Sequence, residues 1–420
     1  MQKQLKEKIK NKLMTEYLKA FSDKEFAEEI HLRGLIEKIF KDIRTRENIT
    51  ISNEEEENIT KELIEDIIGF GPIETILKDP RVSEIMINGP HKIYVERSGR
   101  TEVTDLKFDN EKQLMYIIQK MLMPTRRRVD ETSPFTDLRL ADGSRVNIII
   151  PPVSTIGPVV TIRKFSKEIK QIEDLIRLNT LDKRMAEFLI AAIKAKINII
   201  FSGPTGSGKT TTLNVLSSYI PESERIITIE DTSELILNQE HWIPLEAKQA
   251  GIEGKGEITI RDLFKNSLRM RPDRIVIGEI RSGEGLDMLQ AICSGHSGTL
   301  SIIHANSAAD VIYRLETMIL TSEGIIGLEG IRRQIAASIN LIVHQQQGQD
   351  GIRRITQISE IRGIHEKDIL MEDIFIFETE GIGPQGNVLG RWKASGVKPL
   401  FLPKFKKMGI FLSEDIFNRD

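Results

Sequence analysis

A short segment near the middle of the chain decides the fold: residues 197–213 read INIIFSGPTGSGKTTTL. Within it, residues 203–210 fit the phosphate-binding loop pattern G-x-x-x-x-G-K-[ST] at every defined position. The apolar run before the loop predicts a strand that ends at Ser202, and a helix is expected to open through Thr211. A glycine-rich loop without a ligand is the alternative, but it would not explain both the full pattern and its flanks.

Each residue type in this loop has a physical role. The glycines let backbone N–H groups turn toward phosphate oxygens, and the helix N-terminus adds partial positive charge. Lys209 is expected to reach the β- and γ-phosphates, and the Thr210 hydroxyl is expected to bind Mg²⁺. We therefore predict a site for ATP and Mg²⁺ that is formed by Gly203, Pro204, Thr205, Gly206, Ser207, Gly208, Lys209, Thr210 and Thr211.

Downstream of the loop, short apolar runs alternate with helical stretches. This alternation predicts an α/β domain with a mostly parallel central sheet that is covered by helices. The expected strands are 197–202, 226–229, 274–279, 299–304 and 341–344. Residues 355–361 and 374–377 are expected to add an antiparallel pair.

Acidic residues follow two of these strands. Strand 226–229 runs into Glu230, and strand 274–278 runs into Glu279. Ligands of open parallel sheets gather at the carboxyl ends of the strands, where a carboxylate can orient an attacking water or hold Mg²⁺. The usual residue at the second position is Asp, so it stays open whether Glu279 touches the metal itself. Solvated strand-end acids are the alternative for both.

Two histidines flank the strand 299–304. His304 would lie at its carboxyl end near the same site, where a neutral imidazole can sense a phosphate. A structural role is the alternative for His304 and for His296. Zinc is not expected, because Cys293 and His296 alone are too few ligands.

The N-terminal part of the chain has a different pattern. Residues 1–78 are expected to be helical, with Leu5, Ile9, Leu13, Tyr17 and Phe21 at helical spacing. Residues 79–166 are expected to form a small α+β domain with a hairpin around Asp142-Gly143. Residues 167–178 are predicted to be a linker, and residues 179–420 the ATPase domain.

Three arginines lie on predicted strands of the α+β domain: Arg139, Arg145 and Arg163. Arginine disperses the negative charge that develops during phosphoryl transfer. A two-residue Asp142-Gly143 loop would place Arg139 and Arg145 on opposite faces of the sheet, and a three-residue loop would place them on one face. Arg281, which follows the second strand-end acid, is a further candidate. Solvated surface arginines are the alternative for each.

Composition narrows the function classes. The 420 residues are 40% apolar, which excludes a mainly disordered chain, and the formal net charge of −3 disfavours a polycation built to coat nucleic acid. A single cysteine points to a reducing, cytosolic compartment. The sequence shows no apolar run of membrane-spanning length, and the basic start lacks the apolar segment of a signal peptide. Any membrane role is therefore expected to be peripheral or to act through a partner.

The motifs together resemble the type II/type IV secretion ATPase superfamily, and most closely its CpaF-type Tad pilus assembly branch. The resemblance covers roughly residues 60–415. It is carried by the phosphate-binding loop at 203–221 and by segments that resemble other parts of the family. These are the arginine-bearing first domain (133–152 and 161–165), the Asp box (225–235), the Walker B segment (252–281), the His box (294–307) and the tail (339–345, 373–382 and 401–410). Thr232 stands where many relatives have proline.

The resemblance implies a RecA-like ATPase domain preceded by a PAS-like domain, in a homo-hexamer with each ATP between two subunits. Glu230 then matches the general base, Glu279 the acid near Mg²⁺, and His304 the second His-box histidine. Arg139, Arg145 and Arg163 match the arginines that the N-terminal domain supplies to the phosphates. The implied function is a cytoplasmic motor that acts on an inner-membrane platform protein of a pilus or secretion system, with indirect membrane contact and no specific nucleic acid.

Two competing functions remain from the sequence. A RecA-like nucleic-acid translocase would share the core, although the near-neutral charge and 5% aromatic residues disfavour a strand-binding groove. A nucleotide-gated scaffold would bind ATP without turning it over. The sequence does not separate pilus assembly from retraction or secretion, nor arginines acting in cis from those acting in trans.

Overall fold

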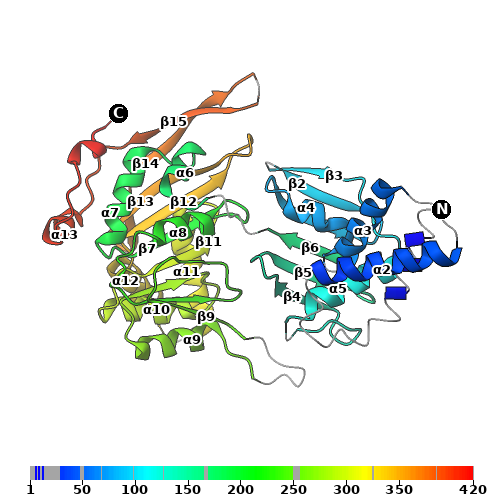
Figure 1. The fold of residues 1–420 in the computed structure, drawn as a ribbon. Coiled ribbons are helices and arrows are strands. Elements are labelled where there is room, and N and C mark those ends of the chain that lie inside the picture. Colours follow the sequence, from blue (N-terminus) through cyan, green and yellow to red (C-terminus); the bar gives the residue numbers. More distant parts are fainter. Residues whose placement is uncertain are drawn as a thin grey trace. The chain divides into compact units, whose positions relative to one another are not determined.

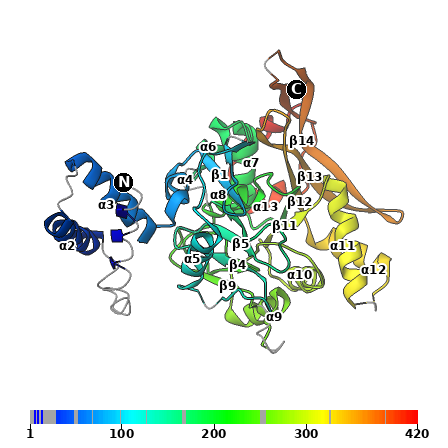
Figure 2. The ribbon, with the colours of Figure 1, turned by 90° about the vertical axis from the view of Figure 1, so that its right-hand side faces the viewer.

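The structure is a computed structural model of the 420-residue chain. It describes residues 5–6, 8–9, 12–13, 29–47, 52–67, 69–97, 99–125, 127–164, 169–248, 256–323, 326–384 and 386–419. The chain divides into two compact units, Met1–Phe165 and Ser166–Asp420, and each is described by itself (Figures 1 and 2).

The first unit begins with helices that share a small apolar core. Helix α2 spans Glu29–Glu47 and α3 spans Asn53–Ile67. A capping box opens α3, because Ser52 Oγ accepts from Glu55 N at 3.2 Å and the Glu55 carboxylate accepts from Ser52 N at 3.1 Å. Of the predicted N-terminal stripe, the structure describes three residues, all buried in this core: Leu5, Ile9 and Leu13. Tyr17 and Phe21 lie outside the described residues.

An antiparallel sheet forms the rest of the first unit, in the order β3-β2-β1-β6-β5-β4. Its elements are η3 (Gly71–Ile73), α4 (Glu74–Lys78), β1 (Val82–Asn88), β2 (Ile93–Arg97), β3 (Arg100–Val103), α5 (Glu111–Leu122), β4 (Phe135–Arg139), β5 (Arg145–Ile149) and β6 (Val159–Arg163). Alternate residues of β5 and β6 are buried with α5, as period-two strands require. The predicted hairpin around Asp142-Gly143 is confirmed as β4–β5.

A nine-stranded sheet organises the described part of the second unit, in the order β15-β14-β13-β12-β7-β11-β10-β8-β9. Strands from β12 to β9 in this order run parallel, and β13 to β15 add antiparallel pairs. The bounds are β7 (Ile199–Gly203), β8 (Ile226–Glu230), β9 (Trp242–Glu246), β10 (Arg274–Ile277), β11 (Leu300–His304), β12 (Leu341–Gln347), β13 (Arg353–His365), β14 (Asp368–Ile382) and β15 (Val388–Ala394).

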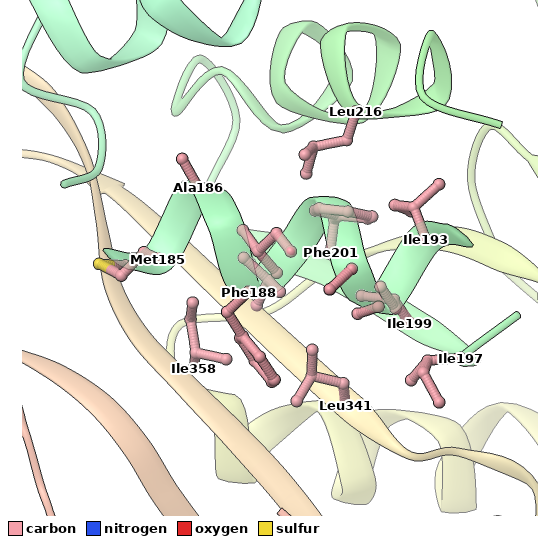
Figure 3. Close-up of a cluster of buried hydrophobic side chains, with 14 of the residues drawn as sticks. Met185, Ala186, Phe188, Ile193, Ile197, Ile199, Phe201, Leu216, Leu341 and Ile358 are labelled. Atoms are coloured by element: carbon pink, nitrogen blue, oxygen red, sulfur yellow. The ribbon is translucent and has the colours of Figure 1, made fainter. Parts of the chain in front are cut away.

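Helices cover both faces of this sheet, and successive residues of a strand face different cores. Ile199 and Phe201 of β7 pack in the core with α6, α7, α8 and α13, while Ile200 packs in the core with α9, α10, α11 and α12. Figure 3 shows Phe188 and Ile193 of α7 beside β7. The helices are α6 (Ile172–Arg177), α7 (Lys183–Lys194), α8 (Lys209–Ser217), α9 (Ile260–Ser267), α10 (Glu284–Cys293), α11 (Ala308–Glu323), α12 (Leu328–Ser338) and α13 (Leu402–Lys407).

The predicted fold class is confirmed: a mostly parallel α/β sheet follows a small α+β domain and a helical region. Part of the predicted linker 167–178 forms helix α6. Ile172 and Leu175 lie one helical turn apart on it and pack in the same core as Ile199 and Phe201.

Strands β3, β9 and β15 were not predicted from the sequence. All three are edge strands whose residues are mostly exposed or half-buried; polar residues interrupt the pattern of β3 and β15, and Pro244 lies within the apolar run of β9, where it argues against a strand. Among the described residues, the helices are too short or too polar to cross a membrane.

Candidate functional site

The phosphate-binding loop lies between the buried strand β7 and helix α8. Gly203, Gly206 and Gly208 have φ values of 148°, 77° and 92°, in a region that favours glycine. Gly208 is also the N-cap of α8. A residue with a Cβ would be strained at these three positions, so the glycines allow the backbone to take this path into α8.

The residues of the loop fit a phosphate group. Ser207 is fully buried, and its Oγ has no hydrogen-bond partner within the described structure. A buried hydroxyl without a partner is costly, and a phosphate oxygen is a suitable acceptor for it. Together with the three glycines and the helix N-terminus, this hydroxyl forms the chemical environment of an anion site.

Lys209 links the loop to the neighbouring strand β11. Its side chain is nearly buried, and Nζ donates a hydrogen bond to Pro204 O at 2.7 Å. The same Nζ lies 3.4 Å from His304 Nδ1 at the carboxyl end of β11. The structure therefore brings together the lysine and the histidine that the sequence predicted for one site.

Glu279 continues this chain of polar contacts. Its Oε1 lies 3.2 Å from His304 Nε2, and its Oε2 accepts from Arg281 at 2.8 Å. Burial raises the pKa of Glu279, but the hydrogen bonds from His304 and Arg281 outweigh it and hold the pKa at about 2. The second amino group of Arg281 contacts Asp231 at 3.1 Å. Glu279 is therefore ionised, and an ionised carboxylate is a ligand that suits Mg²⁺.

Glu230 ends β8 in a different environment. Only 3% of it is exposed, and its Oε1 accepts backbone N–H groups of Glu234 at 2.8 Å and Leu235 at 3.0 Å. Burial dominates these bonds and raises the pKa of Glu230 to about 7. Gly278 makes room for this side chain, because a Cβ at Gly278 would lie 2.7 Å from Glu230 Cγ. Glu230 at the end of β8 is thus in contact with Gly278, which directly follows β10 and precedes Glu279.

The three arginines of the first unit lie in one row. Arg139 is paired with Arg145 across β4 and β5, and Arg145 with Arg163 across β5 and β6, so the three occupy the same face. A bond from Leu140 N to Ser144 O at 2.9 Å closes a three-residue loop, which decides between the two loop lengths that the sequence left open. The loop and the arginines belong to separately described units, so their joint action stays a prediction.

The remaining candidates have structural partners. His296 Nδ1 lies 3.2 Å from Ala291 O, and Cys293 Sγ lies 3.1 Å from Ser338 Oγ. Within the described ranges, no group of three or more His, Cys, Asp or Glu residues is placed to hold a metal ion.

Sequence reasoning missed a second layer of residues around the loop. Gln345 and Arg353 contact it from β12 and β13, and the buried His344 lies 2.9 Å from Ser202 Oγ. Burial lowers the pKa of His344 to about 4, so this imidazole is neutral near pH 7. The only local signal was the run of glutamines after the apolar strand, and it does not reveal which strand lies beside it.

The chain is similar to secretion proteins. A family model described as type II/IV secretion system protein matches residues 66–357. The type IV secretion system protein VirB11 of Bartonella quintana is 31% identical over 326 residues, covering 68% of this chain and 90% of that protein. A putative conjugal transfer protein of Mycobacterium tuberculosis is 29% identical over 303 residues, covering 71% and 86%. The crystal structure of the Brucella suis VirB11 ATPase with sulphate is 28% identical, covers 68% of this chain and 91% of that chain, and has a TM-score of 0.38.

Proposed function

The chain belongs to the type II/IV secretion system protein family, and from this premise we propose that it is a Mg²⁺-dependent ATPase that converts ATP and water to ADP and phosphate. The observation that carries the proposal is the run of contacts from Lys209 at the phosphate-binding loop through His304 to the ionised Glu279. It supplies one ammonium group and one carboxylate beside a glycine-rich anion site. Phosphoryl transfer needs this combination to bind the phosphates and a metal.

Each residue has a proposed role. The loop residues 203–208 and Lys209 bind the phosphates, and Thr210 and Glu279 hold Mg²⁺, directly or through water. The metal would neutralise charge on the phosphate oxygens. Glu230 orients the attacking water and accepts its proton, and a carboxylate whose pKa is about 7 suits this role near neutral pH. His304 reports the state of the phosphate site through its contacts to Lys209 and Glu279.

We also propose the setting in which hydrolysis does work. The chain forms a homo-hexamer in the cytoplasm, and the ring drives assembly of a Tad or type IV-like pilus, or type II-like secretion, through an inner-membrane platform protein. The arginine row of the first unit supplies positive charge to the phosphates. The sequence resemblance to the CpaF-type assembly ATPases and the similarity to a type IV secretion system protein support this setting.

Lys209→Ala tests the enzyme proposal. We expect phosphate release from ATP to fall to background, because the variant loses the ammonium group beside the β- and γ-phosphates. Phosphate release is measured on purified wild-type protein and the variant with Mg²⁺ present. Lys183→Ala, which removes an exposed lysine at the start of α7, is the control and should keep wild-type turnover. Equal turnover in Lys209→Ala and wild type would show that the loop is not the hydrolytic site.

A further inference from the structure

The hairpin made by β12 and β13 lies against the phosphate-binding loop. Strand β12 runs parallel to β7 and pairs with it up to His344 opposite Ser202. The register of β12 with β13 shifts between His344 and Gln345. Beyond this bulge, Gln345 lies against Gly203 and Gly208 of the phosphate-binding loop. The hairpin therefore packs against the phosphate-binding loop.

Gln345 fits the glycines of the loop closely. A Cβ at Gly203 would lie 2.0 Å from the Gln345 carbonyl oxygen, and a Cβ at Gly208 would lie 2.9 Å from Gln345 Nε2. Gln345 Oε1 accepts a hydrogen bond from Thr212 Oγ1 at 2.8 Å. Only 3% of Gln345 is exposed. Gln345 thus contacts the start of the loop through its backbone carbonyl, and the end of the loop and the first turn of α8 through its side chain.

Arg353 holds the middle of the loop. It is the first residue of β13, and its Nε donates a hydrogen bond to Gly206 O at 2.8 Å. The planar peptide that carries this carbonyl also carries the Ser207 N–H, so the direction of one fixes the direction of the other. Ser207 N donates to Pro204 O at 3.3 Å, within the loop. Arg353 therefore sets the orientation of a loop peptide from outside the ligand site.

A buried ion pair holds the turn of the hairpin. Arg354 forms two hydrogen bonds to the Asp350 carboxylate, at 2.9 and 2.7 Å, and both side chains are largely buried. Asp350 also accepts Val388 N at 3.0 Å. Bidentate arginine–carboxylate pairs fix geometry as well as charge. The turn thus fixes the backbone next to Arg353 in advance. This preorganisation lowers the entropy cost of the hydrogen bond that Arg353 makes to the loop.

We propose that Arg353 is a positioning residue for nucleotide binding: through the Gly206 carbonyl it holds the phosphate-binding loop in the shape that receives the phosphates, with Gln345 fixing the two ends. This inference rests on the proposed ATPase function and deepens it. Arg353 acts on the loop rather than on the ligand, so its loss affects the binding of ATP and ADP more than the chemical step.

The test uses two variants of similar length. Arg353→Met removes the donor and the charge, whereas Arg353→Gln places an amide N–H where the arginine Nε lies and removes the charge and the outer guanidinium N–H groups. We expect Arg353→Met to raise the KM for ATP and the Kd for ADP about tenfold, equivalent to about 1.4 kcal/mol. Arg353→Gln should show a smaller rise of about threefold, because a neutral donor retains part of the bond. The kcat should fall less than threefold in both.

Controls separate the possible outcomes. Arg391→Gln, which removes an exposed arginine paired with Glu380, should keep wild-type KM and Kd. A purely structural role would lower the active fraction, and hence kcat, without raising KM. The inference is overturned if Arg353→Met keeps KM and Kd within twofold of wild type, or if Arg353→Gln is as defective as Arg353→Met. Failure of the wild-type protein to bind ADP would instead overturn the proposed function.

Discussion

Two carboxylates at the ends of neighbouring strands have opposite electrostatics. Glu279 is held ionised by His304 and Arg281, with a pKa of about 2, whereas burial raises the pKa of Glu230 to about 7. When the surroundings of two carboxyl groups shift their pKa values in opposite directions, the two groups can take different chemical roles. A permanently ionised carboxylate suits a metal ligand, and one that exchanges its proton near pH 7 suits a general base. This contrast supports the roles proposed from the sequence resemblance.

The raised pKa of Glu230 also predicts a pH-dependent stability. Its ordinary value is 4.5 and its folded value is about 7, so the folded state binds the proton more tightly. The contribution of Glu230 to the free energy of unfolding is full below pH 4.5 and is lost as pH rises through 7. Because Gln is uncharged, Glu230→Gln should exceed wild type in stability by about 1–3 kcal/mol at pH 8 and match it near pH 4.5.

Tryptophan fluorescence during urea unfolding measures this difference. The chain has two tryptophans, Trp242 in β9 and Trp392 in β15, so the signal reports the second unit alone. The exposed Glu222→Gln is the control and should show no stabilisation at either pH. A Glu230→Gln variant that is equally destabilised at pH 4.5 and pH 8 would contradict the prediction, because packing rather than desolvation would then dominate.

Residues of the site were predictable where the signal is local. The loop pattern fixes Lys209 and Thr210 within one strand–turn–helix unit, and Glu230, Glu279 and His304 follow from the ends of apolar runs. The opposite pKa shifts of the two glutamates were not predictable. They depend on the contact of Gly278 with Glu230 and on the hydrogen bonds of Arg281, both of which exist only in the folded structure.

Among the elements, the β12–β13 hairpin shows that sequence patterns predict strands but not which strands are neighbours in the sheet. The apolar run of β12 predicted a strand, but strand order is a tertiary property, and only the order β12-β7-β11 places Gln345 and Arg353 beside the loop. The β4–β5 hairpin shows a second limit. Asp142-Gly143 is compatible with loops of two or three residues, and the pairing of Leu140 with Ser144 selects three.

The arginine row across β4, β5 and β6 predicts a conflict between stability and function. Arg145 lies directly opposite both Arg139 and Arg163, and like charges in cross-strand pairs destabilise a sheet. Arg145→Thr should therefore raise the free energy of unfolding of the first unit by up to about 1 kcal/mol at low salt. The same change should lower ATP hydrolysis on the order of 10³-fold.

Amide hydrogen exchange of β4, β5 and β6 measures the stability of this unit, and phosphate release measures turnover. Arg81→Thr is the control, because Arg81 donates two hydrogen bonds to the Asp79 carboxylate and its loss should not stabilise the sheet. High salt should shrink the gain in Arg145→Thr by screening the repulsion. A variant that hydrolyses ATP at the wild-type rate would remove this arginine from the proposed site.

At the scale of the whole molecule, the proposed site draws on two separate units. The phosphate-binding loop belongs to the second unit and the arginine row to the first. The sequence gives no local signal for whether one chain supplies both parts of a site. In the proposed homo-hexamer each ATP lies between two subunits, and we predict that Arg145 serves the nucleotide of a neighbouring copy.

Mixing two inactive variants tests this arrangement. Lys209→Ala keeps the arginine row but loses the loop lysine, and Arg145→Ala keeps the lysine but loses the arginine. If Arg145 acts in trans, random mixed rings contain sites with both groups intact at about a quarter of all positions, and turnover should recover to about that share of wild type. If Arg145 acts on its own chain's nucleotide, no site in a mixed ring is complete. Native mass spectrometry verifies that mixed rings form, and mixed rings without turnover would place the arginine in cis.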